Sequence, residues 1–228
     1  MTRLAIVGYG KMGKMLEQLA PEAGFAVHAR IDVGDDFAAA EGSDVAIEFT
    51  QPEVVLQNVE KLAAMKIPTV IGTTGWLQHL PRVRETVASA KTSLIWSPNF
   101  SVGVNVFLCL VREAAMLLKD EAAYGAWAWE IHHDTKKDAP SGTLLKLVDE
   151  MKSAGYQRSI DVSSNRAGRH PGTHDIGFDS TADTITLRHA ARSREGFARG
   201  ALKAAQWLTE NKDKHGVFEF SELFFPRR

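Results

Sequence analysis

The amino-acid sequence predicts an α/β protein: a parallel, doubly wound sheet with helices on both faces, plus a smaller α+β domain. Strand-like and helix-like segments alternate over about the first hundred residues, a glycine pattern follows the first strand, and the alternation stops after Asn99. Such alternation is typical of parallel strands joined by helices that cover both faces of one sheet. We therefore expect a larger domain formed by residues 1–99 and 195–228, and a smaller second domain formed by residues 100–194.

The first domain is expected to contain five short apolar strands, each followed by a helix or a turn. These strands are Arg3–Val7, Phe25–Ile31, Val45–Phe49, Pro68–Ile71 and Ser93–Trp96. Helices are expected over Met12–Ala20, over Pro52–Met65 and in a stretch that ends at Ala90. Pro52 is expected to open its helix, because the first turn leaves that N–H unpaired in any case.

The second domain is expected to mix helices and strands in another order. A long helix over Val104–Lys119 precedes a strand that ends at His132, a polar loop and a helix from Thr143. Three strand-like pieces follow, at Ser159–Ser164, Asp175–Phe178 and Thr184–His189, and the Gly/Pro-rich stretch Asn165–Thr173 is expected to be a loop. A helix over Phe197–Leu208 and the apolar tail Val217–Phe220 are expected to return to the first domain.

Composition excludes several classes of protein. Lys plus Arg (27) nearly balances Asp plus Glu (28), so no global field favours nucleic acid or an anionic membrane. The one cysteine, Cys109, lies in an apolar run and is expected to be a buried small hydrophobe, in keeping with a reducing compartment. The apolar segments are too short for a signal peptide or a membrane span, so we expect a cytoplasmic protein.

A glycine pattern predicts a dinucleotide site of the Rossmann type. The pattern G-x-G-x-x-G comprises Gly8, Gly10 and Gly13, with Lys11 and Met12 between the last two. It follows a strand and opens a helix, whose N-terminus suits a pyrophosphate. Asp32 ends the next strand, where an acid accepts hydrogen bonds from a ribose. The alternative is a structural glycine turn with a solvated aspartate.

The choice of cofactor also depends on Asp32. Its charge would repel a 2′-phosphate, and Lys11 is the one cation placed to neutralise that phosphate. NADH is therefore slightly favoured, with NADPH tolerated. Gly72-Thr73-Thr74-Gly75 follows the fourth strand and is expected at the same carboxyl edge of the sheet, facing the cofactor.

The loop between Glu130 and Thr143 predicts the chemistry of the second domain. It brings together His132, His133, Lys136 and a helix start at Ser141-Gly142-Thr143. Cations and free backbone N–H groups suit a substrate with more than one carboxylate, and the histidines suit a step that needs a proton. The alternative is that each histidine is structural or exposed.

A metal site is not expected. The candidate ligands are His132, His133, His170 and His174, but they lack the spacing of known zinc sites.

Taken together, these motifs resemble the dihydrodipicolinate reductase family of the diaminopimelate–lysine pathway, over nearly the whole chain. The matching segments are the glycine pattern at 8–13, EFTQPE at 48–53, IGTTG at 71–75, NFSVGVNV at 99–106 and the run E-x-H-H-x-x-K-x-D-x-P-S-G-T from Glu130 to Thr143. The last of these is the most specific.

The resemblance implies a reaction and a role for each matching residue. A hydride from the reduced cofactor would reach C4 of an unsaturated cyclic dicarboxylate, with His132 as general acid and Lys136 holding and polarising the substrate. Residues implied to bind the substrate are His133, Ser141, Gly142, Thr143 and Thr74. Residues implied to bind the cofactor, in addition to the glycine pattern and Asp32, are Gly72, Thr73, Thr74, Ser97, Pro98, Asn99 and Phe100.

One departure from the family concerns assembly. Relatives form homotetramers through the sheet of the second domain, but here Ser164–Gly168 runs almost directly into Gly172–His174, about one strand short of the usual pattern. The remaining sheet edge still invites pairing with another chain, with less area for a second interface. We expect a homo-oligomer, with a dimer favoured over a tetramer.

Two alternatives to this function stay open. One is a Rossmann-type reductase of a different imine or keto acid, and the other is a non-catalytic nucleotide sensor on the same fold. The presence of both His132 and Lys136 argues against the sensor.

Overall fold

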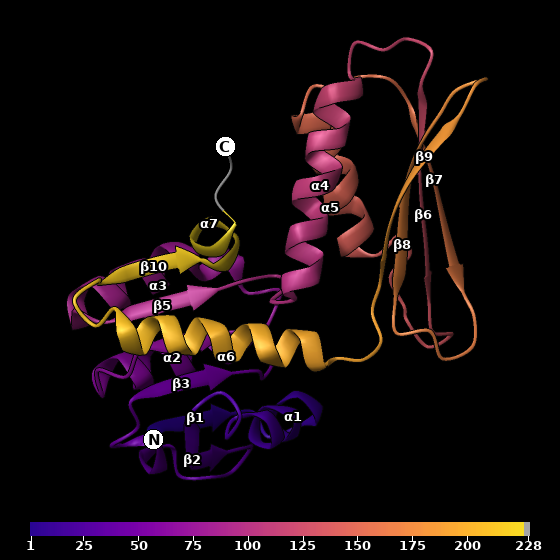
Figure 1. Cartoon of the computed structure of the whole chain (residues 1–228). Coiled ribbons are helices and arrows are strands. Elements are labelled where there is room, and N and C mark those ends of the chain that lie inside the picture. Colours follow the sequence, from indigo (N-terminus) through magenta and orange to yellow (C-terminus); the bar gives the residue numbers. More distant parts are fainter. Residues whose placement is uncertain (226–228) are drawn as a thin grey trace. The chain divides into compact units, whose positions relative to one another are not determined.

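The computed structural model describes residues 1–225, which form two compact units. The first unit combines Met1–Val102 with the chain from Glu195 onward, and the second is Gly103–Arg194. Figure 1 shows that the first contains a sheet covered by helices, and the second a sheet with two helices on one face.

The first unit is built on a parallel six-stranded sheet in the order β10-β5-β4-β3-β1-β2. Its strands are β1 (Thr2–Val7), β2 (Phe25–Ile31), β3 (Val45–Glu48), β4 (Thr69–Ile71), β5 (Ser93–Trp96) and β10 (Gly216–Glu219). The predicted parallel sheet is confirmed. The apolar tail does return to this unit, because β10 pairs with β5.

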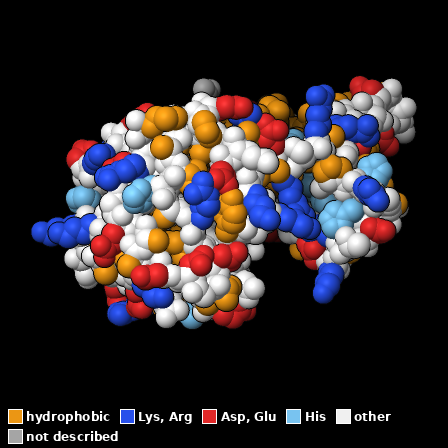
Figure 2. Space-filling model, turned by 90° about the horizontal axis from the view of Figure 1, so that it is seen from below, with side chains coloured by type: hydrophobic (Ala, Val, Ile, Leu, Met, Phe, Trp, Pro, Cys, Tyr) orange, Lys and Arg blue, Asp and Glu red, His pale blue; other side chains and the backbone are white. Residues whose placement is uncertain are grey.

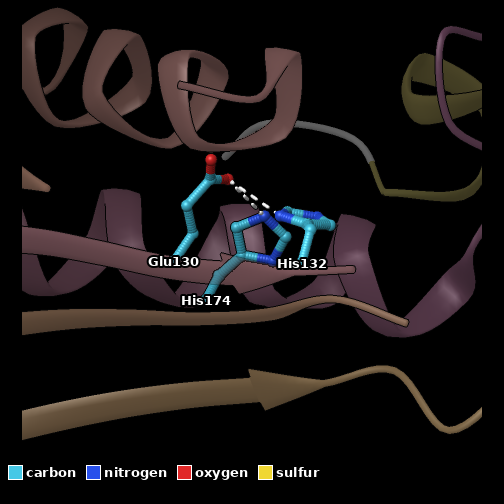
Figure 3. A group of neighbouring side chains, drawn as sticks. All are labelled: Glu130, His132 and His174. Carbon is cyan, nitrogen blue, oxygen red and sulfur yellow. Dashed lines mark ion pairs between the residues drawn. The ribbon is translucent and has the colours of Figure 1, made fainter. Parts of the chain in front are cut away.

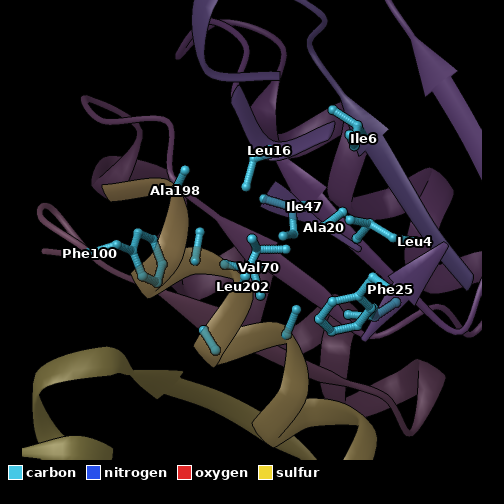
Figure 4. Close-up of a cluster of buried hydrophobic side chains, with 14 of the residues drawn as sticks. Leu4, Ile6, Leu16, Ala20, Phe25, Ile47, Val70, Phe100, Ala198 and Leu202 are labelled. Atoms are coloured by element: carbon cyan, nitrogen blue, oxygen red, sulfur yellow. The ribbon is translucent and has the colours of Figure 1, made fainter. Parts of the chain in front are cut away.

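Successive strand residues point to opposite faces of the sheet, and apolar residues of β1 point to both. Helices therefore cover both faces. The helical segments are α1 (Lys11–Leu19), η1 (Phe37–Ala40), α2 (Val55–Ala64), η2 (Leu77–His79), α3 (Leu80–Ala90), α6 (Glu195–Glu210) and α7 (Phe220–Phe224). Leu4 and Ile6 of β1 pack with Leu16 of α1 and Leu202 of α6 (Figure 4). The neighbouring residue Ala5 lies in the cluster on the other face.

The prediction that Pro52 opens a helix is wrong, because α2 begins at Val55. The N–H of Val54 donates to the carbonyl of Gln51 at 3.2 Å, which closes a turn with Pro52 at its second position. Proline favours that position of a turn because its ring fixes φ there. The fixed φ suits both the turn and a helix start, and here the turn is formed.

The second unit has a four-stranded mixed sheet in the order β7-β6-β8-β9. Its elements are α4 (Val102–Leu118), β6 (Gly125–His132), α5 (Gly142–Ser153), β7 (Ile160–Arg166), β8 (Thr173–Asp179) and β9 (Thr184–Ala190). Strand β6 runs parallel to β7 and antiparallel to β8. Residues of α4 and α5 form the hydrophobic core with this sheet, so the predicted α+β character is confirmed.

The prediction that Cys109 is buried is wrong: its side chain is exposed. Phe107, Val111 and Ala115 recur at helical spacing and form the buried side of α4. Cys109 lies two residues from both Phe107 and Val111, which places it on the opposite side of the helix. An apolar run on a helix therefore does not by itself imply burial of each member.

Charged side chains of both signs lie on the surface of the described residues (Figure 2). Within residues 1–225, no helix is both long enough and apolar enough to cross a bilayer. Basic and acidic side chains are mixed over the face shown in Figure 2. This mixture agrees with the balanced composition of the chain.

Candidate active site

A buried carboxylate lies at the end of β6 in the second unit. Along this strand Glu130 and His132 point to the same face, because they are two residues apart. Both are buried, with 0% of Glu130 and 7% of His132 exposed. The next residue, His133, is half-buried, and its Nδ1 lies 2.7 Å from the hydroxyl of Thr135. The two adjacent histidines therefore have different surroundings.

Glu130 accepts hydrogen bonds from three neighbouring residues. The donors are the backbone N–H of Ser141 at 2.8 Å, the Ser141 hydroxyl, the hydroxyl of Ser164 at 3.0 Å and Nη2 of Arg166 at 2.9 Å. Burial raises the pKa of Glu130, but the hydrogen bonds from Ser141, Arg166 and Ser164 outweigh it and hold the pKa below its usual range. Glu130 is thus a fixed negative charge inside the second unit.

Two histidines face this carboxylate (Figure 3). Oε2 of Glu130 lies 3.5 Å from Nδ1 of His132 and 3.3 Å from Nε2 of His174. The two imidazole rings meet edge to face, with centroids 5.0 Å apart. The arrangement follows from strand register, which pairs Glu130 with His174 on β8 and with Ser164 on β7.

The charges around the two histidines set their acidity. Burial lowers the pKa of His132, and the carboxylate of Glu130 opposes that effect. The cations of Lys136 and Arg166 lower the same pKa further. Burial and the neighbouring His132 lower the pKa of His174 to about 4, so His174 is neutral near pH 7.

The loop after β6 carries the other predicted residues of this region. Lys136 donates to Asp138 at 2.7 Å, and this contact lowers the pKa of Asp138. Ser141 caps α5, with its hydroxyl accepting from the N–H of Leu144 at 3.2 Å. Gly142 is exposed at the start of the helix, with open space beside its Cα, and Thr143 is half-buried. The exposed first turn of α5 is the part able to receive a carboxylate.

Sequence reasoning assigned no catalytic or binding role to four residues of this cluster, Glu130, Arg166, Gly172 and His174, and considered His174 only as a ligand of a metal site that was not expected. Gly172, in the connection 167–172 between β7 and β8, lies so close to His132 that an added Cβ would be 2.9 Å from Nε2. Only Glu130 carried a local signal, because it lies two residues before His132 on a predicted strand. The others come together through pairing of strands far apart in sequence.

Among residues 1–225, one group of three or more side chains has its ligand atoms close enough to hold a metal ion: Glu130, His132 and His174. His133 and His170, the other predicted candidates, are outside this group. Glu130 is already bound to the Arg166 guanidinium and to the Ser141 hydroxyl, and a cation would compete with both. The chemistry therefore favours a carboxylate held by Ser141 and Arg166, with the two histidines beside it.

The glycine pattern of the first unit forms a close-fitting turn. Gly8 has φ +92°, and a Cβ there would lie 2.0 Å from the carbonyl oxygen of Phe49. A Cβ at Gly13 would lie 2.3 Å from the carbonyl oxygen of Gly8. Gly10, in contrast, borders open space and precedes α1, and within residues 1–225 it makes no side-chain capping hydrogen bond. This cradle fits a pyrophosphate, with a free helix N-terminus and room for close approach.

The remaining cofactor candidates follow the carboxyl ends of strands in this sheet. The hydroxyl of Thr73 accepts from the N–H of Thr50 at 2.7 Å, while Thr74 is exposed. The hydroxyl of Ser97 donates to the carbonyl of Asn99 at 2.8 Å. Pro98 is exposed and Phe100 is buried in the core. Lys11 and Met12 begin α1 directly after Gly10. Asp32 is exposed after β2, whose last residue Ile31 accepts from the N–H of Gly8 at 2.8 Å, and Gly72 comes directly after β4.

Comparison with known proteins gives matches to both units. Family models match residues 2–100 (dihydrodipicolinate reductase, N-terminus) and residues 103–224 (dihydrodipicolinate reductase, C-terminus). The chain is 34% identical to the 4-hydroxy-tetrahydrodipicolinate reductase of Christiangramia forsetii, over 96% of each chain. It is also 34% identical to the reductase of that name from Methanoregula boonei, over 98% of each.

A solved structure has the same fold. It is a dipicolinate-bound dihydrodipicolinate reductase from Paenisporosarcina sp. TG-14, with a TM-score of 0.81 and 22% identity. The match covers 99% of this chain and 100% of that chain.

Proposed function

This chain belongs to the dihydrodipicolinate reductase family, and from that premise we infer that it is an NAD(P)-dependent 4-hydroxy-tetrahydrodipicolinate reductase. The enzyme acts in diaminopimelate and lysine biosynthesis. The observation that carries this conclusion is the match of both units to one family, with full-length relatives of one name. The match spans the glycine turn and the loop with His132 and Lys136.

We assign the proton-donating step to His132. Its buried imidazole lies beside a fixed carboxylate, and burial with two nearby cations makes the imidazolium a stronger acid. Reduction of the unsaturated ring leaves an electron-rich carbon that needs a proton, and a strong acid delivers one readily. A bound dicarboxylate would favour the protonated form of His132 before the step.

We assign substrate binding to Lys136 and to the first turn of α5. Gly142 and Thr143 would offer backbone N–H groups to one carboxylate, with His133 and Thr74 as further contacts. The hydroxyl and N–H of Ser141 already donate to Glu130. Ser141 is therefore expected to contribute to substrate binding by fixing the position of the first turn of α5.

The glycine turn would hold the cofactor, which supplies a hydride when bound. Gly8, Gly10 and Gly13 form the cradle, with Lys11 and Met12 at the helix start, and Asp32 would accept hydrogen bonds from the ribose. Gly72, Thr73, Thr74 and the turn Ser97–Phe100 would border the nicotinamide. The exposed acid Asp32 favours NADH slightly over NADPH. The absence of a spanning helix within residues 1–225 is compatible with the cytoplasmic location that we propose.

The substrate is thus a small cyclic dicarboxylate, and the assembly that we propose is a homo-oligomer, with a dimer favoured over a tetramer. Light scattering after size exclusion at micromolar protein tests the assembly. A mass near two chains is expected, and a mass of one chain would exclude any oligomer.

Oxidation of NADH with enzymatically generated substrate tests the function. The control omits the substrate-generating enzyme. Turnover only in the complete mixture is expected. No turnover with this substrate but turnover with another imine or keto acid would indicate a different reductase, and NADH binding without turnover on any of these would indicate a nucleotide sensor.

A further inference from the structure

The two oxygens of Glu130 have different neighbours. Oε1 accepts from the Ser141 N–H, from the Ser164 hydroxyl and from Arg166. Oε2 accepts from the Ser141 hydroxyl and faces the two histidines. One oxygen is therefore saturated with fixed donors, and the other is directed at His132 and His174.

The two ring nitrogens of His132 also have different neighbours. Nδ1 is buried, has no hydrogen-bond partner among residues 1–225, and lies 3.5 Å from Oε2 of Glu130. Nε2 lies on the side of Gly172, where any Cβ would be only 2.9 Å away. A carboxylate at one nitrogen of a histidine fixes the tautomer and leaves the other nitrogen for chemistry. The missing side chain at Gly172 leaves space beside Nε2.

We propose that Glu130 is a positioning residue that holds His132 through Nδ1, so that Nε2 carries the proton given to the substrate. This proposal rests on the function proposed above. His174 does not take the role of His132, because it turns its Nε2 toward the same carboxylate oxygen at 3.3 Å and its Nδ1 is buried, so neither of its ring nitrogens is left for the substrate.

The charged groups around His132 give the direction of the expected effect. Glu130 on β6 and Asp138 in the loop favour the imidazolium, whereas Lys136 and Arg166 disfavour it, as does His174 on β8 when that ring is protonated. Removing the charge of Glu130 leaves the cations without their buried counter-charge. His132 should then lose its proton at a lower pH.

The test compares Glu130→Gln with the wild type in two measurements. In NMR titration of the whole protein, with the His132 signal identified by its loss in His132→Gln, the titration midpoint is expected at lower pH in Glu130→Gln. With NADH and generated substrate, kcat near neutral pH is expected to fall roughly ten- to a hundredfold. The KM for NADH should not change.

A matched control and a double variant separate positioning from structure. Glu121→Gln makes the same charge change before the start of β6, and the length of the strand places the start of β6 roughly 20 Å from its end at His132. This variant should leave both the His132 midpoint and kcat unchanged. In the His132→Gln background, Glu130→Gln should lower kcat by less than about twofold, because the residue through which it acts is gone.

Three outcomes would overturn the proposal: an unchanged His132 midpoint, an equal loss of kcat in both backgrounds, or an equal effect of Glu121→Gln. If Glu130→Gln fails to fold, Glu130→Asp withdraws the carboxylate by one methylene and should lower the same midpoint by less. The NMR midpoint reports on Glu130 even if the wild type does not turn over, whereas absent wild-type turnover would count against the proposed function alone.

Discussion

The two candidate sites of this chain are built on opposite principles. The glycine turn of the first unit depends on side chains that are missing, since a Cβ at Gly8 or Gly13 would overlap the backbone. The cluster of the second unit depends on polar side chains that are present, with the buried carboxylate of Glu130 at its centre. The first should therefore be sensitive to added atoms, and the second to removed charge. This contrast gives a way to damage each site separately.

The largest effect is expected from Gly8→Ala, because the new Cβ would lie 2.0 Å from the carbonyl of Phe49 at a φ of +92°. The strain costs on the order of 1–3 kcal/mol. We expect NADH-dependent turnover to fall at least about a hundredfold, because the turn must move from its productive position. Thermal unfolding measures the strain, calorimetric titration measures the loss of NADH binding, and steady-state kinetics measures the loss of turnover.

Gly10→Ala is the matched control, since Gly10 borders open space. It should weaken NADH binding by crowding the pyrophosphate and leave the unfolding temperature unchanged. Equal unfolding temperatures for the two variants would show that the turn is not close-packed.

The next effect concerns the charge of the second unit. Lys136→Ala removes a cation that would neutralise a substrate carboxylate, a hydrogen bond to a charged group worth about 1.5–3 kcal/mol. We expect kcat/KM for the substrate to fall roughly ten- to a hundredfold, with both kcat and KM affected. Steady-state kinetics with varied substrate measures this. If only the dissociation constant of NADH changed, the loop that carries Lys136 would contact the cofactor and not the substrate.

The buried histidine His174 should make the second unit sensitive to acid. Its pKa is about 4 in the folded chain against 6.5 for an unperturbed histidine, so the unfolded chain binds more protons between these values. Stability should therefore fall as pH drops from 6.5 to 4, by up to about 3 kcal/mol. Urea unfolding at several pH values is the measurement. His174→Gln should flatten the dependence in this window, and an unchanged slope would show that His174 is not buried as described.

The smallest effect is expected at the surface of the first unit. Asp32→Ala removes repulsion of a 2′-phosphate and hydrogen bonds to the ribose of NADH. A change of about 0.5–1.5 kcal/mol corresponds to a two- to tenfold shift toward NADPH. Calorimetry with both cofactors measures the ratio, and an unchanged ratio would mean that Asp32 does not face the ribose.

The same contrast explains what sequence reasoning predicted well. The glycine turn is local: its strand, glycines, helix and acid occur in order within residues 2–32, so spacing alone indicated the structure. The strands at Phe25–Ile31 and Ser93–Trp96 were likewise predicted with their observed bounds. Pro52 was misassigned because its preferred φ suits a turn as well as a helix start.

The second site was predicted only in part, because it depends on register. The loop between Glu130 and Thr143 is contiguous and was recognised as the centre of the chemistry. The contacts of Glu130 with Ser164 and His174 arise from pairing across three strands. Register between distant strands is set by the packing of the whole sheet, which a single sequence does not display.

The most direct test of this account is steady-state oxidation of NADH by His132→Gln, with NADH varied at saturating substrate. General acid catalysis contributes roughly a hundredfold or more, so kcat should fall by about that factor. The KM for NADH should stay at the wild-type value, because His132 belongs to the second unit and the glycine turn to the first. A kcat near that of the wild type would remove His132 from the role of proton donor and contradict the account.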